Sequence, residues 1–246
     1  TARVVACFGL WYVLNVWYNV VNKRVLNAVP LPMSVAVAQL GIGSLWVGIL
    51  WAFKVREGPG KLTAEGARRI APVALFHGGG QLATVLSLGA GAVSFTHVVK
   101  AMEPFFSALV AAVWFRQIFR WQVYAALVPV VAGVSLACYT ELNFSWVSFL
   151  GAMSSNLFFA CRANFSKGLM MRSPTVTRLS AANLYGLVTI VSFIGLAPLA
   201  LGTGARLWGP VWQEALREGH TPGKLASNIF LSGISHYLNN EVGVIA

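Results

Sequence analysis

Charged side chains are scarce in this sequence of 246 residues, and acidic ones are scarcer still. Only 10% of the residues are charged, against about 25% in a typical soluble domain, which argues against a soluble protein. Seven acidic residues stand against eighteen Lys and Arg, a formal charge of +11. The three cysteines, Cys7, Cys138 and Cys161, are isolated in apolar segments, so their spacing offers neither a disulfide framework nor a metal site. We expect no metal and no cofactor.

Signatures of catalysis and of targeting are missing as well. The sequence contains no His-Glu-x-x-His, no Gly-x-Ser-x-Gly and no paired carboxylates, and its only acids deep in apolar runs are Glu103 and Glu241. No signal or transit peptide is visible. We therefore expect no enzymatic activity. A membrane enzyme stays an alternative that would turn over in detergent, and a channel is another that would conduct without a counter-substrate.

Apolar side chains, by contrast, make up 57% of the sequence. A helix needs about 20 mostly apolar residues to cross a bilayer, because its backbone polar groups cannot face lipid unsatisfied. Eight such runs are present, at residues 3–22, 31–53, 70–90, 92–115, 121–140, 145–166, 179–202 and 225–246. The fold class that we predict is all-α, a polytopic bundle of transmembrane helices.

The links between these runs are mostly short, but two are longer. We expect residues 61–69 to form a short amphipathic helix at the membrane interface and residues 204–224 to lie outside the membrane. Most cations lie between the apolar runs and not in one patch, which fits contact with membrane lipid and argues against nucleic acid. Loops on the N-terminal side carry ten cations and those on the other side five, so the N-terminal side is the positive side.

Polar residues interrupt five of the apolar runs at helical spacing. They are Asn15, Asn19 and Asn22 in the first run, His77, Gln81, Thr84 and Ser87 in the third, Thr96, Lys100, Glu103 and Ser107 in the fourth, Ser155, Arg162 and Ser166 in the sixth, and His236, Asn240 and Glu241 in the eighth. Each set falls mainly on one helix face. We expect these faces to converge on a single cavity.

Lys100 is the sharpest single signal in the sequence. A lysine at membrane depth costs about 2.5–3.5 kcal/mol, and such residues usually face a cavity. The alternative is a structural pair with Glu103, three residues further along the same helix face. Arg162 is the second cation inside a run, and it either shapes the pathway or snorkels to the interface near Lys167.

Two histidines also fall inside apolar runs, where they serve either in gating or as hydrogen-bonded contacts between helices. His77 precedes Gln81 by four residues, as His236 precedes Asn240. This weak similarity pairs the third run with the eighth. The first run ends in Asn22-Lys23 and the sixth in Ser166-Lys167, which pairs the first run with the sixth.

These pairings imply a repeat of five helices. An odd number of spans inverts the second copy relative to the first, as in many transporters whose sites lie near the midplane. Residues 1–140 would form the first repeat, and residues 145–246 a second repeat that is truncated after its third helix. Two complete repeats would need ten helices.

Residues Ala92 to Phe106 read Ala-Val-Ser-Phe-Thr-His-Val-Val-Lys-Ala-Met-Glu-Pro-Phe-Phe. This stretch closely resembles the signature of the plastidic phosphate translocators, a family of the drug/metabolite transporter superfamily. Residues 127–142, 144–167 and 236–242 are also similar to the family, so the resemblance covers most of the chain. It implies ten helices and the exchange of inorganic phosphate for phosphorylated sugars or three-carbon acids across the inner envelope membrane of plastids.

The resemblance also implies roles for single residues. Lys100 matches the family lysine that binds the substrate phosphate, and Thr84 matches a hydroxyl that contacts the substrate. Gln81 stands where the triose-phosphate branch has His and the phosphoenolpyruvate branch has Asn, and Asn239 stands where a substrate-contacting Tyr is common. The family continues to a Lys-Arg pair in a ninth helix, which this sequence does not reach.

Together these features predict a secondary antiporter that exchanges inorganic phosphate for triose phosphate, 3-phosphoglycerate or phosphoenolpyruvate. Lys100 would supply fixed charge, whose attraction for an anion is strengthened in a low-dielectric cavity. Thr84 and Gln81 would supply neutral hydrogen bonds, and Arg162 would help to shape the pathway. The alternative is a nucleotide-sugar or other sugar-phosphate carrier of the same superfamily, which needs a larger cavity.

Overall fold

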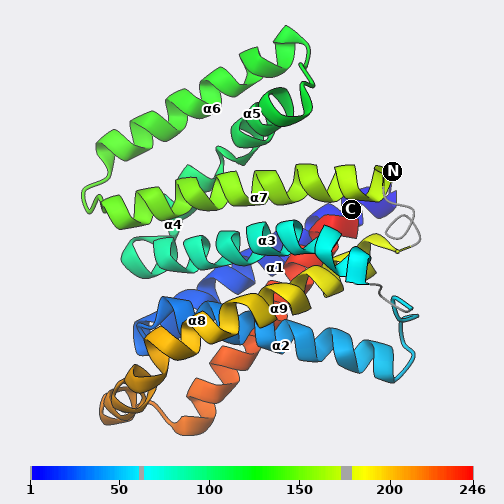
Figure 1. Cartoon of the computed structure of the whole chain (residues 1–246). Coiled ribbons are helices and arrows are strands. Elements are labelled where there is room, and N and C mark those ends of the chain that lie inside the picture. Colours follow the sequence, from blue (N-terminus) through cyan, green and yellow to red (C-terminus); the bar gives the residue numbers. More distant parts are fainter. Residues whose placement is uncertain (1, 61–63, 173–178, 246) are drawn as a thin grey trace.

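The structure, a computed structural model, describes residues 2–60, 64–172 and 179–245. Every regular element in this part of the chain is a helix (Figure 1). The helices are α1 (Ala2–Ala28), α2 (Pro32–Ala52), α3 (Ala64–Ala90), α4 (Val93–Lys100), α5 (Glu103–Phe115), α6 (Trp121–Thr140), α7 (Trp146–Arg172), α8 (Ala181–Arg217) and α9 (Pro222–Ile245). The predicted all-α class is confirmed, and each predicted apolar run contains a helix.

The sequence predicts a single helix over the apolar run 92–115, but the structure divides this run into α4 and α5. α4 ends at Lys100, and α5 begins at Glu103 after a two-residue turn. Pro104 explains the break, because proline lacks the N–H that would bond to the Lys100 carbonyl and its ring clashes with that carbonyl. Lys100 therefore stands at the C-terminal end of a short helix, where the helix dipole favours a cation.

The first of the two long links differs from its prediction, and most of the second is helical. Residues 64–69 are not a separate interfacial helix but the start of α3, and residues 61–63 lie outside the described part of the chain. α8 runs without interruption to Arg217, so most of the expected polar link is helix. At about 1.5 Å per residue, the 37 residues of α8 are longer than the roughly 30 Å hydrocarbon core of a bilayer.

Five segments of the described chain are long and apolar enough to cross a membrane. They are α2, α3, the combined α4 and α5, α6 and α8. α1, α7 and α9 also have sufficient length, at 27, 27 and 24 residues, and they carry three of the five polar stripes found in the sequence. The helices that are least apolar are therefore the ones expected to face one another instead of lipid.

α3 lies at the centre of the bundle (Figure 1). It packs along α7 on one side and α8 on the other, while α1 pairs with α9 and α2 lies against α8 and α9. α5 and α6 lie on the far side of α7, at the top of Figure 1. α6 has one buried residue, Val134, within the described chain, so it contributes little to the interior.

α3 and α7 approach each other most closely at Gly151. A Cβ atom built on Gly151 would lie 3.0 Å from the backbone oxygen of Ala83 and 3.1 Å from the backbone nitrogen of Ser87. Small residues allow such close approach between membrane helices. The contact brings the polar face of α7, with Ser155 and Arg162, against the polar face of α3.

Candidate functional site

A cavity of about 460 Å³ lies among α1, α3, α7, α9 and the break between α4 and α5. Its lining consists of Phe8, Trp11, Asn15, Tyr18, Asn19, Gln81, Thr84, His97, Lys100, Ala101, Glu103, Phe159, Arg162, His236, Asn239, Asn240 and Gly243. The five polar stripes converge here, as the spacing predicts. On α1 and α9 the lining extends to Phe8 and Gly243, so the cavity reaches toward the end of the bundle where α1 begins and α9 ends.

Lys100 reaches across from the end of α4 to two hydroxyl groups. Its Nζ donates hydrogen bonds to Thr84 Oγ1 at 3.1 Å and to Ser155 Oγ at 3.3 Å, and those two oxygens are 2.7 Å apart. Within the described residues Lys100 forms no ion pair with Glu103. The helix break separates the two residues, so the three-residue spacing on one face that suggested the pair does not apply. Within the described residues, the hydrogen-bond partners of Lys100 Nζ are therefore neutral hydroxyl groups.

Arg162 lies beside the same aromatic ring as Lys100. The Phe159 ring centre is 4.9 Å from Lys100 Nζ and 5.1 Å from Arg162 Cζ, distances at which a cation is attracted to a ring face. Arg162 Nη1 also donates to Asn240 Oδ1 at 3.5 Å. The guanidinium therefore turns into the bundle and does not extend to the interface beside Lys167.

The charges around the cavity are mostly positive. Of the described residues that line it, Lys100 and Arg162 are cations and Glu103 is the one carboxylate. Attraction between charges grows as the surrounding dielectric constant falls, and a cleft of one sign concentrates ligands of the other sign. The site therefore suits a small anion.

A network of buried amides forms the wall behind Gln81. Gln81 Nε2 donates to Tyr18 OH at 3.1 Å and to Gln39 Oε1, and Gln39 Nε2 donates in turn to Asn22 Oδ1 at 2.7 Å and Ser232 Oγ at 2.5 Å. All five residues are buried. A buried polar network of this kind is rigid when its members are satisfied, so Gln81 is held in one orientation.

At the end of the bundle opposite the start of α1, Lys23 joins α1 to the end of α3. Lys23 Nζ donates to the backbone oxygens of Leu88, at 2.7 Å, and Gly91, at 2.9 Å. These carbonyls belong to the last turn of α3 and the turn that follows it, where no intrahelical donor is available. Lys23 thus ties α1 to the link between α3 and α4.

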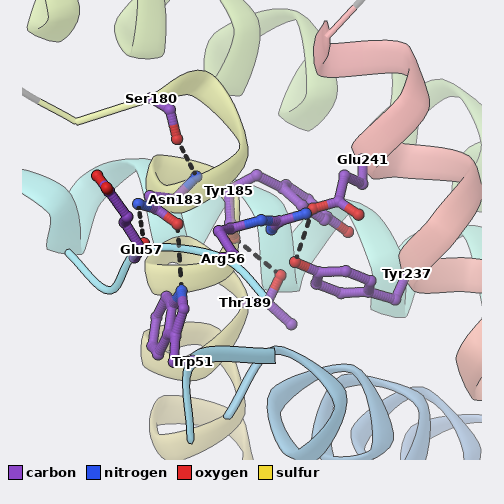
Figure 2. Close-up of polar contacts among 9 residues, drawn as sticks. All are labelled: Trp51, Arg56, Glu57, Ser180, Asn183, Tyr185, Thr189, Tyr237 and Glu241. Atoms are coloured by element: carbon purple, nitrogen blue, oxygen red, sulfur yellow. Dashed lines mark hydrogen bonds and ion pairs between the residues drawn. The ribbon is translucent and has the colours of Figure 1, made fainter. Parts of the chain in front are cut away.

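The other end is organised around the link between α2 and α3, shown in Figure 2. Arg56 of this link forms an ion pair of 2.5 Å with Glu241 of α9, which also accepts a hydrogen bond of 3.2 Å from Tyr237 OH. Asn183 of α8 donates to the Glu57 backbone oxygen at 2.9 Å. Glu241 does not line the cavity, so this pair holds the end of α9 from the side away from the site.

Sequence comparison identifies the relatives of this helical, cation-lined bundle. The sequence model of the Triose-phosphate Transporter family matches residues 2–246. The chain belongs to this family. The predicted family membership is therefore confirmed.

Three curated members of the Triose-phosphate Transporter family illustrate the range of relatives. Phosphoenolpyruvate/phosphate translocator 2, chloroplastic, of Arabidopsis thaliana is 41% identical over 194 residues, which are 79% of this chain and 50% of the relative. Glucose-6-phosphate/phosphate translocator 2, chloroplastic, of the same species is 38% identical over 86% of this chain and 53% of its own length. The triose phosphate/phosphate translocator of non-green plastids from Brassica oleracea var. botrytis is 38% identical over 78% and 47%. The chain spans about half the length of the curated relatives it matches.

Most of the predicted site residues of this family member come together. Lys100, Thr84, Gln81, Asn239 and Arg162 all line the cavity, as do Glu103 and His236. His77 does not. It lies buried behind the wall, where its ring stacks on that of His236 with centroids 5.9 Å apart and meets the ring of Tyr185 edge-on at 5.3 Å. Lys167 is exposed and lies with Arg116 at a separate hollow between α5 and α7.

Some of the residues that shape the site were not singled out from the sequence. Tyr18 is buried, and its hydroxyl accepts a hydrogen bond from Gln81. Gln39 was overlooked, although a lone amide in the apolar run 31–53 must find a partner. Phe159 is apolar and does not stand out in an apolar run. Its contact with Lys100 becomes visible only when α4 and α7 are packed together.

Proposed function

We propose that this chain forms the substrate-binding part of an antiporter that exchanges inorganic phosphate for phosphorylated three-carbon compounds. Triose phosphate, 3-phosphoglycerate and phosphoenolpyruvate are the cargo class, and the inner membrane of the plastid envelope is the location. The names of the relatives, which are chloroplastic phosphate translocators, support both proposals. The chain itself transports and does not catalyse.

The observation that carries the proposal is the state of Lys100. It is a lysine at membrane depth, bound to two hydroxyls and, within the described chain, to no carboxylate. A phosphate oxygen can replace or join these hydroxyls as an acceptor, and a charge-assisted bond to it is about twice as strong as a neutral one. Arg162, on the same Phe159 ring, supplies the second positive charge that a dianion needs.

Exchange, as opposed to one-way transport, follows from the same charges. Closing an empty cavity would bury Lys100 and Arg162 without a counter-ion, and an uncompensated buried charge is costly. A bound anion removes this cost. The carrier would therefore switch between its two open states only when it is loaded.

Alternating access would come from two inverted repeats, residues 1–140 and 145–246, moving against each other. The packing of the helices supports this division. α3 packs on α7 as α9 packs on α1, and α2 packs on α9 as α8 packs on α3. A two-fold relation that exchanges α1 with α7, α2 with α8 and α3 with α9 would convert each of these pairs into the other.

A sugar phosphate is the second candidate cargo. A cavity of about 460 Å³ lies within the range of roughly 300–1,000 Å³ typical of small-ligand sites. A relative named for glucose 6-phosphate matches 86% of the chain. Competition by glucose 6-phosphate in the assay below would favour this candidate.

The test is counter-exchange in liposomes that hold the full-length gene product. Labelled phosphate should enter liposomes preloaded with phosphate or 3-phosphoglycerate, and it should stay outside liposomes that contain only buffer. Protein-free liposomes with the same preload give the leak. Equal uptake with and without the preload would refute antiport.

A further inference from the structure

The cavity has a second polar wall, opposite Lys100, on α9. His236, Asn239 and Asn240 line it, and two of their atoms have no hydrogen-bond partner within the described residues, His236 Nε2 and Asn239 Oδ1. His236 is 1% exposed. Leaving a buried polar atom without a partner is energetically unfavourable, so each is a candidate contact for a ligand.

The orientation of the Asn240 amide can be assigned from its neighbours. Its Nδ2 lies 3.0 Å from the backbone oxygen of His236, which can only accept, and its Oδ1 lies 3.5 Å from Arg162 Nη1, which can only donate. Both contacts require the same orientation of the amide. Exchanging the nitrogen and the oxygen would place two donors together at one end and two acceptors at the other.

This orientation also determines the state of the imidazole. Asn240 Nδ2 lies 3.4 Å from His236 Nδ1, so Nδ1 faces a donor and must act as the acceptor. The proton of a neutral imidazole then resides on Nε2. His236 thus offers a neutral N–H donor, fixed in position and unused by the described part of the protein.

We infer that His236 determines cargo specificity by donating its Nε2–H to an oxygen at the end of the cargo remote from the phosphate. Resting on the proposed function, this inference places the phosphate at Lys100. A chain of contacts runs from Lys100 over Phe159 to Arg162, then through Asn240 to His236. The carboxylate or carbonyl oxygen of a three-carbon cargo would meet His236 at the far end of this chain.

Inorganic phosphate and 3-phosphoglycerate therefore differ in what they require. Inorganic phosphate is a single tetrahedral group and can be held by Lys100 and Arg162 without a contact to His236. 3-Phosphoglycerate carries a carboxylate at the other end of its carbon chain, and that carboxylate needs a donor. Loss of the His236 donor should weaken binding of 3-phosphoglycerate and spare binding of inorganic phosphate.

The experiment measures equilibrium binding of labelled phosphate and labelled 3-phosphoglycerate to the purified full-length protein in detergent. His236→Phe keeps a ring that stacks on His77 but removes the donor. It should raise the dissociation constant of 3-phosphoglycerate at least about tenfold, the lower limit for a hydrogen bond to a charged group, and leave that of phosphate within about twofold. His236→Gln restores an N–H near the position of Nε2 and should recover most of the loss.

The matched control is His77→Phe. It makes the same ring exchange in the stacked partner, which is equally buried but does not line the cavity, so both dissociation constants should stay unchanged. Equal weakening of both ligands by His236→Phe, or no effect on 3-phosphoglycerate, would overturn the inference. If this binding pattern holds while liposomes show no counter-exchange, antiport fails and the role of His236 stands.

Discussion

Lys100→Gln is the most direct test of how the cavity holds an anion. Glutamine keeps a long side chain and an N–H donor for Thr84 and Ser155, so the local packing and hydrogen bonds are largely preserved. What disappears is the positive charge at the end of α4. The double variant Lys100→Gln with Glu103→Gln removes the nearby carboxylate as well, which tests whether Lys100 serves only to neutralise Glu103.

The expected loss follows from the bonds that a phosphate would make. A hydrogen bond to a charged group contributes about 1.5–3 kcal/mol, against about 0.5–1.5 kcal/mol for a neutral one. The two ranges differ typically by about 1 kcal/mol, and the lost attraction of the ammonium group for a dianion in a low-dielectric site adds to this difference. We expect phosphate affinity to fall at least about tenfold, a difference of 1.4 kcal/mol.

Phosphate binding to the purified protein in detergent and counter-exchange in liposomes both report this loss. Lys167→Gln is the matched control, because it removes the same charge from the exposed end of α7, outside the cavity. That variant should bind phosphate normally. Normal exchange by well-expressed Lys100→Gln/Glu103→Gln protein would refute the reasoning, since it would mean that the lysine only balances an acid.

Two further predictions concern the wall and the scaffold of the site. Gln81→His replaces an amide held by Tyr18 with an imidazole, and it should shift the preference among triose phosphate, 3-phosphoglycerate and phosphoenolpyruvate by a few-fold while phosphate uptake persists. If the three compounds compete with labelled phosphate in unchanged proportions, residue 81 does not contribute to substrate preference. Gly151→Ala should destabilise the protein by about 1–3 kcal/mol, because its methyl group meets backbone atoms of α3. Thermal unfolding in detergent checks this, with Gly133→Ala as the control, since nothing lies within 4 Å of that position; an equal effect of both substitutions would contradict the packing argument.

Much of the fold could be predicted because the bilayer imposes simple rules. Apolar runs of sufficient length become helices, and polar residues at helical spacing mark the faces that meet. The break before Pro104 was also present in the sequence, but the apolar character of residues 92–115 outweighed it. α8 could not be bounded in this way, since its last turns are polar enough to suggest a link and are helical nonetheless.

The charged residues of the site could be predicted from the sequence, but most of the residues that contact them could not. Lys100 and Arg162 are conspicuous because a cation in an apolar run has few explanations. Neither the hydroxyl of Ser155 nor the ring of Phe159 could be paired with Lys100 from spacing alone, because these contacts join α4 to α7 across 55 or more residues. Lys167 follows directly after the apolar run 145–166, and its side chain is exposed outside the cavity.

The hydrogen bonds of Lys23 bear on the path that the proposed function gives to an anion. Within the described chain this lysine forms no ion pair and rests on the carbonyls of Leu88 and Gly91. If a salt bridge formed this contact, opening it would release a carboxylate as well as a cation, and the carboxylate would repel a departing phosphate. Opening the Lys23 contact exposes one positive charge and two carbonyl dipoles. Under the proposed function, this contact therefore adds no negative charge to the path of a departing anion.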